Sequence, residues 1–315
     1  MCILAESTLI HKRSRIVCSL VAMQANSEFD TAAGKVVKPI FIMGAPGSGT
    51  TLLYDTLCTH RDLAYVTLNM LRAGIHKRGR FVGERRSALF KTQNLFHRDQ
   101  ASNVPHEANA FWIRYFGTYN YLTEKDFTPE IAAYYRKNVM AVQSLWKRPR
   151  FVNKNLQHGV RSGVLDRIFP DAKFIHIIRD GRAVAYSILN KKDGANPTMF
   201  LLSLKKVLGD RYRPERSELF NYGMAWAQLI NKAREASAFG PDRYYELRYE
   251  DLITRPHEEI KKIIEFCEVD WYGEFEKNIP KTSNMNAKWR DNADENQKKD
   301  LEESTFELRQ ALGIT

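Results

Sequence analysis

The chain has 315 residues, of which 43% are hydrophobic and 27% charged, and its formal net charge is +11. This composition is that of an ordinary globular protein, and the length suits one large α/β domain. The positive charge indicates affinity for anions, from nucleic acid to phosphorylated cofactors. The four cysteines form no CxxC pair, and no apolar run approaches the roughly 20 residues of a membrane-spanning helix. We therefore expect a cytoplasmic protein without a transmembrane segment.

The N-terminal 36 residues are predicted to be a flexible leader outside the fold. A basic run at 11–15 precedes an apolar run at 16–25, as in a signal peptide, but Ser19 and Gln24 interrupt the apolar run. Residues 37–315 are predicted to form a single domain. Within it, a helical insertion at about 69–148 is expected on the substrate side.

Strands and helices are predicted to alternate along this domain. Continuous apolar runs or short β-prone segments predict strands at 39–43, 151–152, 173–178 and 243–247. Helical spacing or start signals predict helices at 50–59, from 126–130 onward, at 163–169 and at 256–267. A polar surface loop is expected at 281–299, before a last helix. The alternation predicts an α/β fold with a P-loop-like central parallel sheet flanked by helices.

A glycine-rich segment, Gly44-Ala-Pro-Gly-Ser-Gly49, separates the first predicted strand from the first predicted helix. Glycines allow successive backbone N–H groups to point inward, and the following helix adds its positive N-terminal end. The segment is therefore interpreted as a phosphate-binding loop rather than a simple turn. Its candidate ligand-binding residues are Gly47, Ser48, Gly49, Thr50 and Thr51.

This loop departs from the P-loop pattern of kinases and ATPases in one position. Thr50 stands where that pattern has the lysine that reaches the β- and γ-phosphates. Transfer of a γ-phosphoryl group would lack a principal cation here. A nucleotide-dependent P-loop kinase is therefore kept only as the alternative enzyme.

A second candidate anion site follows the strand predicted at 173–178. Arg179 lies at the end of that strand, and Ser187 falls two turns into the next predicted helix. A guanidinium fork and a hydroxyl suit a phosphate monoester, and the carboxyl edge of a parallel sheet is where such ligands bind. The alternative is a local ion pair between Arg179 and Asp180. Together the two motifs predict a ligand with two separated phosphate groups.

At this point the motifs resemble those of sulfotransferases that use 3′-phosphoadenosine 5′-phosphosulfate (PAPS). The segment 44–51 resembles their 5′-phosphosulfate loop, and 174–187 resembles their 3′-phosphate motif. The segment 248–252 resembles a third element, in which Tyr249 would lie near the adenine. In the tyrosylprotein branch, Asn153-Lys154-Asn155 resembles the segment of a catalytic lysine, and Ala287-Lys288-Trp289 resembles a cofactor-binding segment.

The resemblance implies in-line transfer of a sulfuryl group from PAPS to a hydroxyl or amine, with no metal. Lys154 is the expected cation on the transferring group, Lys288 and Tyr249 are expected cofactor contacts, and Glu107 is the expected general base. His106 is adjacent to Glu107 and is an alternative base. Gly47 stands where relatives usually carry Lys or Arg. A catalytically impaired module that binds a nucleotide or another anion is therefore kept as an alternative function. Lys154 or another nearby cation could supply the missing charge.

The sequence motifs do not select one acceptor or partner. A saccharide, a lipid, a peptide tyrosine and a small metabolite all remain candidate acceptors, and a homodimer is possible. The basic run from Arg72 to Arg86 could bind nucleic acid or glycan, but such runs are more commonly solvated, and no specific nucleic acid is expected. The aromatic residues between 111 and 121 could line a substrate cleft or form core.

Overall fold

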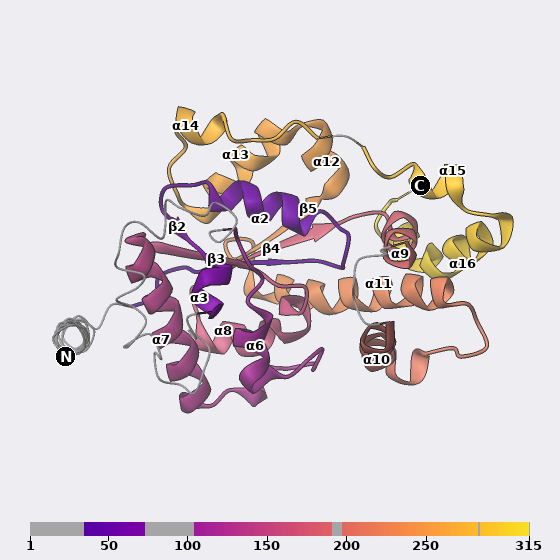
Figure 1. Ribbon diagram of the computed structural model, residues 1–315, viewed down its shortest axis with the longest axis horizontal. Coiled ribbons are helices and arrows are strands. Elements are labelled where there is room, and N and C mark those ends of the chain that lie inside the picture. The colour runs from indigo at the N-terminus through magenta and orange to yellow at the C-terminus, as the bar shows by residue number, and fades with distance from the viewer. Residues whose placement is uncertain (1–34, 73–103, 191–196, 283, 315) are drawn as a thin grey trace, which may run out of the picture.

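The structure is a computed structural model that describes residues 35–72, 104–190, 197–282 and 284–314 (Figure 1). The predicted leader up to residue 34, the basic run beyond Arg72 and part of the predicted insertion lie outside these residues. The division into a leader and a single domain with an insertion stays a prediction.

A five-stranded parallel sheet forms the centre of the molecule, in the order β2-β3-β1-β4-β5 (Figure 1). The strands are β1 (Ile40–Met43), β2 (Leu63–Ala64), β3 (Arg150–Lys154), β4 (Lys173–Ile178) and β5 (Tyr244–Arg248). The predicted α/β fold with a central parallel sheet is therefore confirmed. The strand order places β1 between β3 and β4, so the groups that follow these three strands meet at one edge.

Helices cover both faces of the sheet, because alternate strand residues point to opposite sides. Ile40 and Ile42 of β1 pack into one apolar cluster, while Phe41 and Met43 pack into another. The first cluster contains α2 (Thr50–Cys58), α12 (Tyr249–Thr254), α13 (Pro256–Cys267) and α14 (Gly273–Glu276). The second contains α6 (Asn109–Phe116), α7 (Pro129–Trp146) and α8 (Ser162–Ile168).

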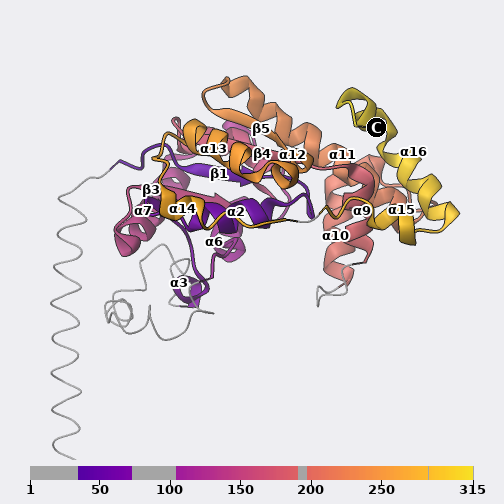
Figure 2. The same cartoon turned by 90° about the horizontal axis from the view of Figure 1, so that it is seen from above.

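A third group of helices lies beyond the carboxyl end of the sheet (Figure 2). It consists of α9 (Gly181–Leu189), α10 (Pro197–Leu208), α11 (Glu218–Arg234), α15 (Lys288–Asn292) and α16 (Glu295–Ala311). The remaining short helices are α3 (Leu68–Arg72), η3 (Glu124–Asp126), η4 (His158–Arg161), η5 (Gly209–Arg211) and η6 (Glu235–Phe239). None of the helices in the described ranges has the length and apolarity needed to cross a bilayer.

The C-terminal region differs from the sequence-based expectation of a polar loop over 281–299. Trp289 is buried in the third apolar cluster, which fixes α15 against α9. The last helix begins earlier than expected, at Glu295, because Asp294 and Gln297 form a reciprocal capping box. The two-residue strand β2 has no counterpart in the prediction, since so short a strand gives no periodic signal.

Candidate active site

The candidate site lies at the carboxyl edge of the sheet, around β1 (Figure 1). The glycine-rich segment follows β1, Lys154 ends β3, and Arg179 follows β4. The register pairs Ile42 of β1 with Lys154, so the lysine stands beside the start of the loop. Ligands of open parallel sheets bind at this edge, where the strand order reverses.

The phosphate loop has the backbone of an anion cradle. Gly47 and Gly49 have φ angles of +83° and +89°, a region that side-chain-bearing residues rarely adopt. A Cβ on Gly49 would lie 2.5 Å from the Tyr249 ring, so glycine is required there for space as well. Within the described chain, the amides of Gly49, Thr50 and Thr51 have no hydrogen-bond acceptor, and neither has the buried Ser48 hydroxyl. These free donors, at the start of α2, suit an anionic ligand.

Arg179 and Ser187 both approach this loop from the β4 side. The Arg179 Nη1 donates to the Gly47 carbonyl at 2.8 Å, and its guanidinium carbon lies 4.4 Å above the centre of the Tyr249 ring. A Cβ placed on Gly47 would be 3.4 Å from the Ser187 hydroxyl. The structure thus brings the two predicted phosphate motifs side by side. The left-handed φ also makes a basic residue at position 47 unfavourable in this backbone.

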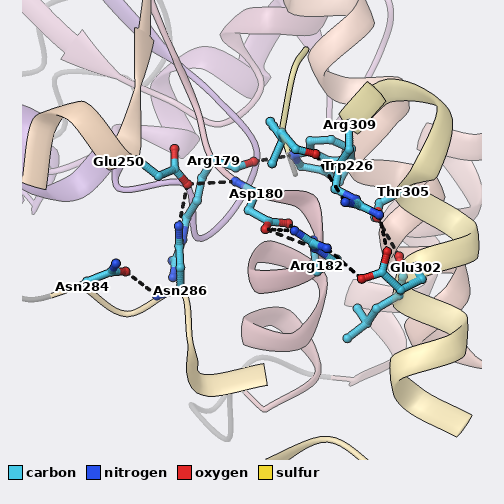
Figure 3. A network of polar contacts seen from close by, with 12 residues as sticks. Arg179, Asp180, Arg182, Trp226, Glu250, Asn284, Asn286, Glu302, Thr305 and Arg309 are labelled. Atoms are coloured by element: carbon cyan, nitrogen blue, oxygen red, sulfur yellow. Dashed lines mark hydrogen bonds and ion pairs between the residues drawn. The ribbon is translucent and has the colours of Figure 1, made fainter. Parts of the chain in front are cut away.

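Two residues that sequence reasoning missed orient Arg179 (Figure 3). The Arg179 Nε donates to the Asn286 Oδ1 at 2.7 Å, and the Asn286 Nδ2 donates to a Glu250 carboxylate oxygen at 2.6 Å. The carboxylate therefore fixes which way the Asn286 amide faces. Burial lowers the pKa of Arg179, and the neighbouring Tyr249, Glu250 and Asp180 oppose this shift. The only signal in the sequence is that Glu250 lies within the segment 248–252 of the family resemblance and that Asn286 directly precedes the segment 287–289.

A further set of ion pairs joins this motif to the C-terminal helix (Figure 3). Asp180 accepts from Arg182, Arg182 donates to Glu302 of α16 at 2.7 Å, and Glu302 also accepts from Arg309. The Trp226 indole donates to the Arg179 carbonyl at 3.1 Å. The predicted local alternative, an Arg179–Asp180 ion pair, is wrong, because the partner of Asp180 is Arg182.

The other two expected cofactor residues lie in different settings. Tyr249 begins α12, and its buried ring packs between Gly49 and Arg179. Lys288 begins α15 and is exposed, and its side chain has no hydrogen bond or ion pair with a described residue. Asn286, rather than Lys288, is the C-terminal residue in contact with Arg179.

Glu107 and Lys154 form an ion pair on the β3 side of β1. The lysine side chain is buried at 4% exposure, while that of the glutamate is 30% exposed, so the carboxylate is the accessible member. A second carboxylate, Asp55 of α2, also lies within electrostatic reach: burial raises its pKa, and Lys154 opposes this. A buried cation beside an accessible carboxylate can stabilise negative charge and accept a proton at neighbouring points.

His106 is differently engaged. Its Nδ1 accepts from the Ala108 amide at 2.9 Å, so the neutral ring carries its proton on Nε2. Burial lowers the pKa of His106, and Lys154 adds to this while Glu107 opposes it. Neither ring nitrogen of this tautomer has a free lone pair. The geometry favours Glu107 over His106 as a base.

The aromatic residues between 111 and 121 divide into two groups. Phe111, Trp112 and Phe116 of α6 are buried in the apolar cluster that contains Phe41, and Tyr115 packs partly buried against the same cluster. Tyr119 and Tyr121 are partly buried against the third cluster. The first group is therefore core. In the described ranges, no cluster of three or more histidine, cysteine or acidic residues has the arrangement of a metal site.

Comparison with known proteins places these features in a family. The model of the sulfotransferase family matches residues 39–273. A putative protein-tyrosine sulfotransferase from Caenorhabditis briggsae is 25% identical over 74% of this chain and 66% of its own length. The omega-hydroxy-beta-dihydromenaquinone-9 sulfotransferase Stf3 from Mycobacterium bovis is 28% identical over 77% of this chain and 65% of its own length.

Solved structures agree on the fold. Sulfotransferase STF9 from Mycobacterium avium superposes with a TM-score of 0.58 at 15% identity, covering 94% of this chain and 82% of that one. The chain spans about two thirds or less of the curated relatives named above. Since the family model covers most of the chain and includes both phosphate motifs, the protein belongs to the sulfotransferase family.

Proposed function

We propose that this chain transfers a sulfuryl group from PAPS to an acceptor hydroxyl. The observation that carries the proposal is the contact of Arg179 with the carbonyl of Gly47, which joins the two anion-binding motifs. The unpartnered loop amides and the Ser48 hydroxyl would hold the 5′-phosphosulfate. Arg179 and Ser187 would hold the 3′-phosphate. Tyr249 and Lys288 remain proposed cofactor contacts.

In this proposal the chain's own residues perform three tasks. PAPS, when bound, supplies the sulfuryl group. The buried Lys154 stabilises negative charge on the transferring group from the β3 side, and it compensates for a loop that has Gly47 in place of a cation. Glu107, held beside Lys154, accepts the proton of the acceptor hydroxyl. Glu107 is neutral once it is protonated, so the positive charge of Lys154 is then available to offset negative charge on the transferring group.

The proposed acceptor class is a hydroxyl rather than an amine. Two curated relatives are named for a phenolic hydroxyl, that of protein tyrosine, and for the hydroxyl of an omega-hydroxylated menaquinone. A carboxylate base suits either, because it needs only to accept a proton as the sulfuryl group transfers. A peptide tyrosine and a hydroxylated lipid are therefore the first acceptors to test.

The test is calorimetry of the wild type with 3′-phosphoadenosine 5′-phosphate (PAP), followed by turnover of PAPS with a tyrosine peptide and with a long-chain alcohol. We expect saturable binding of PAP with one site per chain and turnover with one acceptor. Absence of PAP binding would remove the basis of the proposal. Binding without turnover of PAPS would favour the catalytically impaired module.

A further inference from the structure

Asn155 directly follows Lys154 and lies 1% exposed, with both ends of its amide in use. Its Nδ2 donates to the Glu107 backbone carbonyl at 3.1 Å and to the Asn109 Oδ1 at 2.8 Å. Its Oδ1 accepts from the Gln157 amide at 3.0 Å and from the Arg161 Nη2 at 3.1 Å. Residues 154 and 155 thus contact Glu107 at two points, one at its carboxylate and one at its backbone.

The backbone at this contact is strained. Ala108 has a φ of +57° and a ψ of +38°, a left-handed conformation that non-glycine residues seldom adopt. It is the N-cap of α6, has no side-chain cap and is fully buried. Such a conformation persists only when its surroundings hold it. Two side-chain contacts flank it: the Asn155 Nδ2 donates to the Glu107 carbonyl, and the His106 Nδ1 accepts from the Ala108 amide.

Arg161 anchors Asn155 from behind. It is 1% exposed and has no ion-pair partner among the described residues. Its Nε donates to the Gln157 carbonyl at 2.9 Å, its Nη2 donates to Asn155, and its Nη1 has no hydrogen-bond partner in the described chain. Burying a cation without a carboxylate is costly, so hydrogen bonds to neutral oxygens fix its position. The Asn155 Oδ1 is one of these acceptors for the Arg161 guanidinium.

We propose that Asn155, anchored by Arg161, is a positioning residue that holds the strained Glu107–Ala108 turn and so directs the Glu107 carboxylate toward Lys154 and the transfer site. This inference rests on the proposed function. Asn155 acts through Glu107 and not through the phosphate loop or Arg179. Loss of the positioning role of Asn155 should therefore lower the rate of transfer without weakening cofactor binding, and this difference can be measured.

The decisive variant is Asn155→Asp. The new carboxylate still accepts from Gln157 and gives Arg161 an ionic partner, so folding is expected to be kept. The Asn109 amide can rotate to donate to it. The contact with the Glu107 carbonyl is lost, because two oxygens then face each other. Ala108→Gly is the matched second variant: glycine adopts the left-handed conformation without strain, so the turn no longer needs to be held.

Four proteins are compared: wild type, Asn155→Asp, Ala108→Gly and the double variant. For Asn155→Asp we expect kcat for PAPS turnover, with a tyrosine peptide or with water as acceptor, to fall about tenfold to a hundredfold. The KM for PAPS and the Kd for PAP should stay within about twofold, since the phosphate contacts are unchanged. Ala108→Gly alone should leave kcat unchanged, and in the double variant it should restore most of the loss.

An activity-independent readout is the ¹⁵N spectrum of His106, assigned by comparison with His106→Asn. In the wild type and in Ala108→Gly we expect one tautomer, protonated on Nε2, because Nδ1 accepts from residue 108. In Asn155→Asp the turn opens and both tautomers are populated. The double variant should return to the single tautomer.

The outcomes separate the two proposals. If the wild type binds no PAP, the proposed function fails. If all four proteins bind PAP but Asn155→Asp keeps wild-type kcat and the single His106 tautomer, the positioning role is overturned and the function stands. A loss of kcat that Ala108→Gly does not restore also overturns it. If thermal melting shows Asn155→Asp to be unfolded, Asn155→Ser, which retains an acceptor for Gln157, is measured with the same expectations.

Discussion

The two flanks of β1 are built in different ways. On the β4 side lie the residues proposed to bind the cofactor, here called the cofactor flank: the loop at 44–51 together with Arg179, Ser187 and Asn286. On the β3 side lie the residues proposed to act in transfer, here called the catalytic flank: Glu107, Lys154, Asn155 and Arg161. Among the described residues, the cofactor flank has free donors in the amides of Gly49, Thr50 and Thr51 and in the Ser48 hydroxyl. Beside them lies the Arg179 guanidinium, which is oriented by its hydrogen bonds to Gly47 and Asn286. The catalytic flank has its charges already paired or hydrogen-bonded within the protein.

The difference in how the donors are engaged suits the two flanks to different tasks. Free donors around a glycine cradle are suited to an anion that arrives with its own charge. The ion pair of Glu107 and Lys154 is already formed on a strained turn, and this holds both groups in place for a proton transfer. Gly47 shows the same division of tasks. Its left-handed φ disfavours a basic side chain at this position of the loop, and the cation on the other flank is Lys154.

The largest expected effect is on the catalytic flank. Glu107→Gln keeps the size of the side chain and its hydrogen bond to Lys154 but cannot accept a proton. We expect kcat for sulfuryl transfer to fall by about 10²–10⁴, with the Kd for PAP nearly unchanged. Rapid-quench measurement of PAPS turnover checks this.

The matched control for this substitution is His106→Asn, which changes the adjacent residue. The side-chain oxygen of the new asparagine can still accept from the Ala108 amide, as the His106 Nδ1 does, so the turn is kept and we expect kcat within about threefold of wild type. The reverse pattern, with His106→Asn inactive and Glu107→Gln active, would make the histidine the base.

Lys154→Ala should produce the next largest effect. Removal of the buried cation leaves the transferring group without a positive charge from the β3 side, and we expect kcat to fall by about 10²–10³. Turnover of PAPS under saturating donor is the measurement. Lys173→Met is the control, since Lys173 is equally buried but pairs with Glu268 at the amino-terminal start of β4. A comparable loss in both variants would point to destabilised strands instead.

A smaller effect is expected on the cofactor flank from Asn286→Ala. The Arg179 Nε loses its acceptor, and the guanidinium is less well oriented, which should weaken PAP binding by about 1 kcal/mol, or about fivefold in Kd. Calorimetry measures this directly, with kcat at saturating PAPS expected to change little. Asn292→Ala, on the exposed side of the same segment, should bind PAP as the wild type does. Equal Kd values for all three proteins would show that Asn286 has no part in cofactor binding.

The same division explains how much the sequence could predict. The cofactor flank is made of short segments in which strand, loop and helix follow one another, so glycine spacing and strand ends were enough to propose the glycine-rich loop, Arg179 and Ser187 as anion-binding groups, and the structure brings these groups together. The catalytic flank depends on contacts between residues nearly 50 positions apart, such as that of Asn155 with Glu107. Periodicity carries no information about such contacts. The sequence therefore suggested Glu107 and Lys154 only through the resemblance, and it gave no role to Asn155, Arg161 or Asn286.

If one nucleotide contacts both proposed anion-binding motifs, removal of its 3′-phosphate and removal of the Arg179 side chain should have linked effects on binding. Binding of PAP and of 5′-AMP, which lacks the 3′-phosphate, is measured by calorimetry on wild type and Arg179→Ala. We expect Arg179→Ala to weaken the binding of PAP by about 10² or more but the binding of 5′-AMP by less than about threefold. An equal loss for both ligands would contradict this expectation, because Arg179 would then not bind the 3′-phosphate.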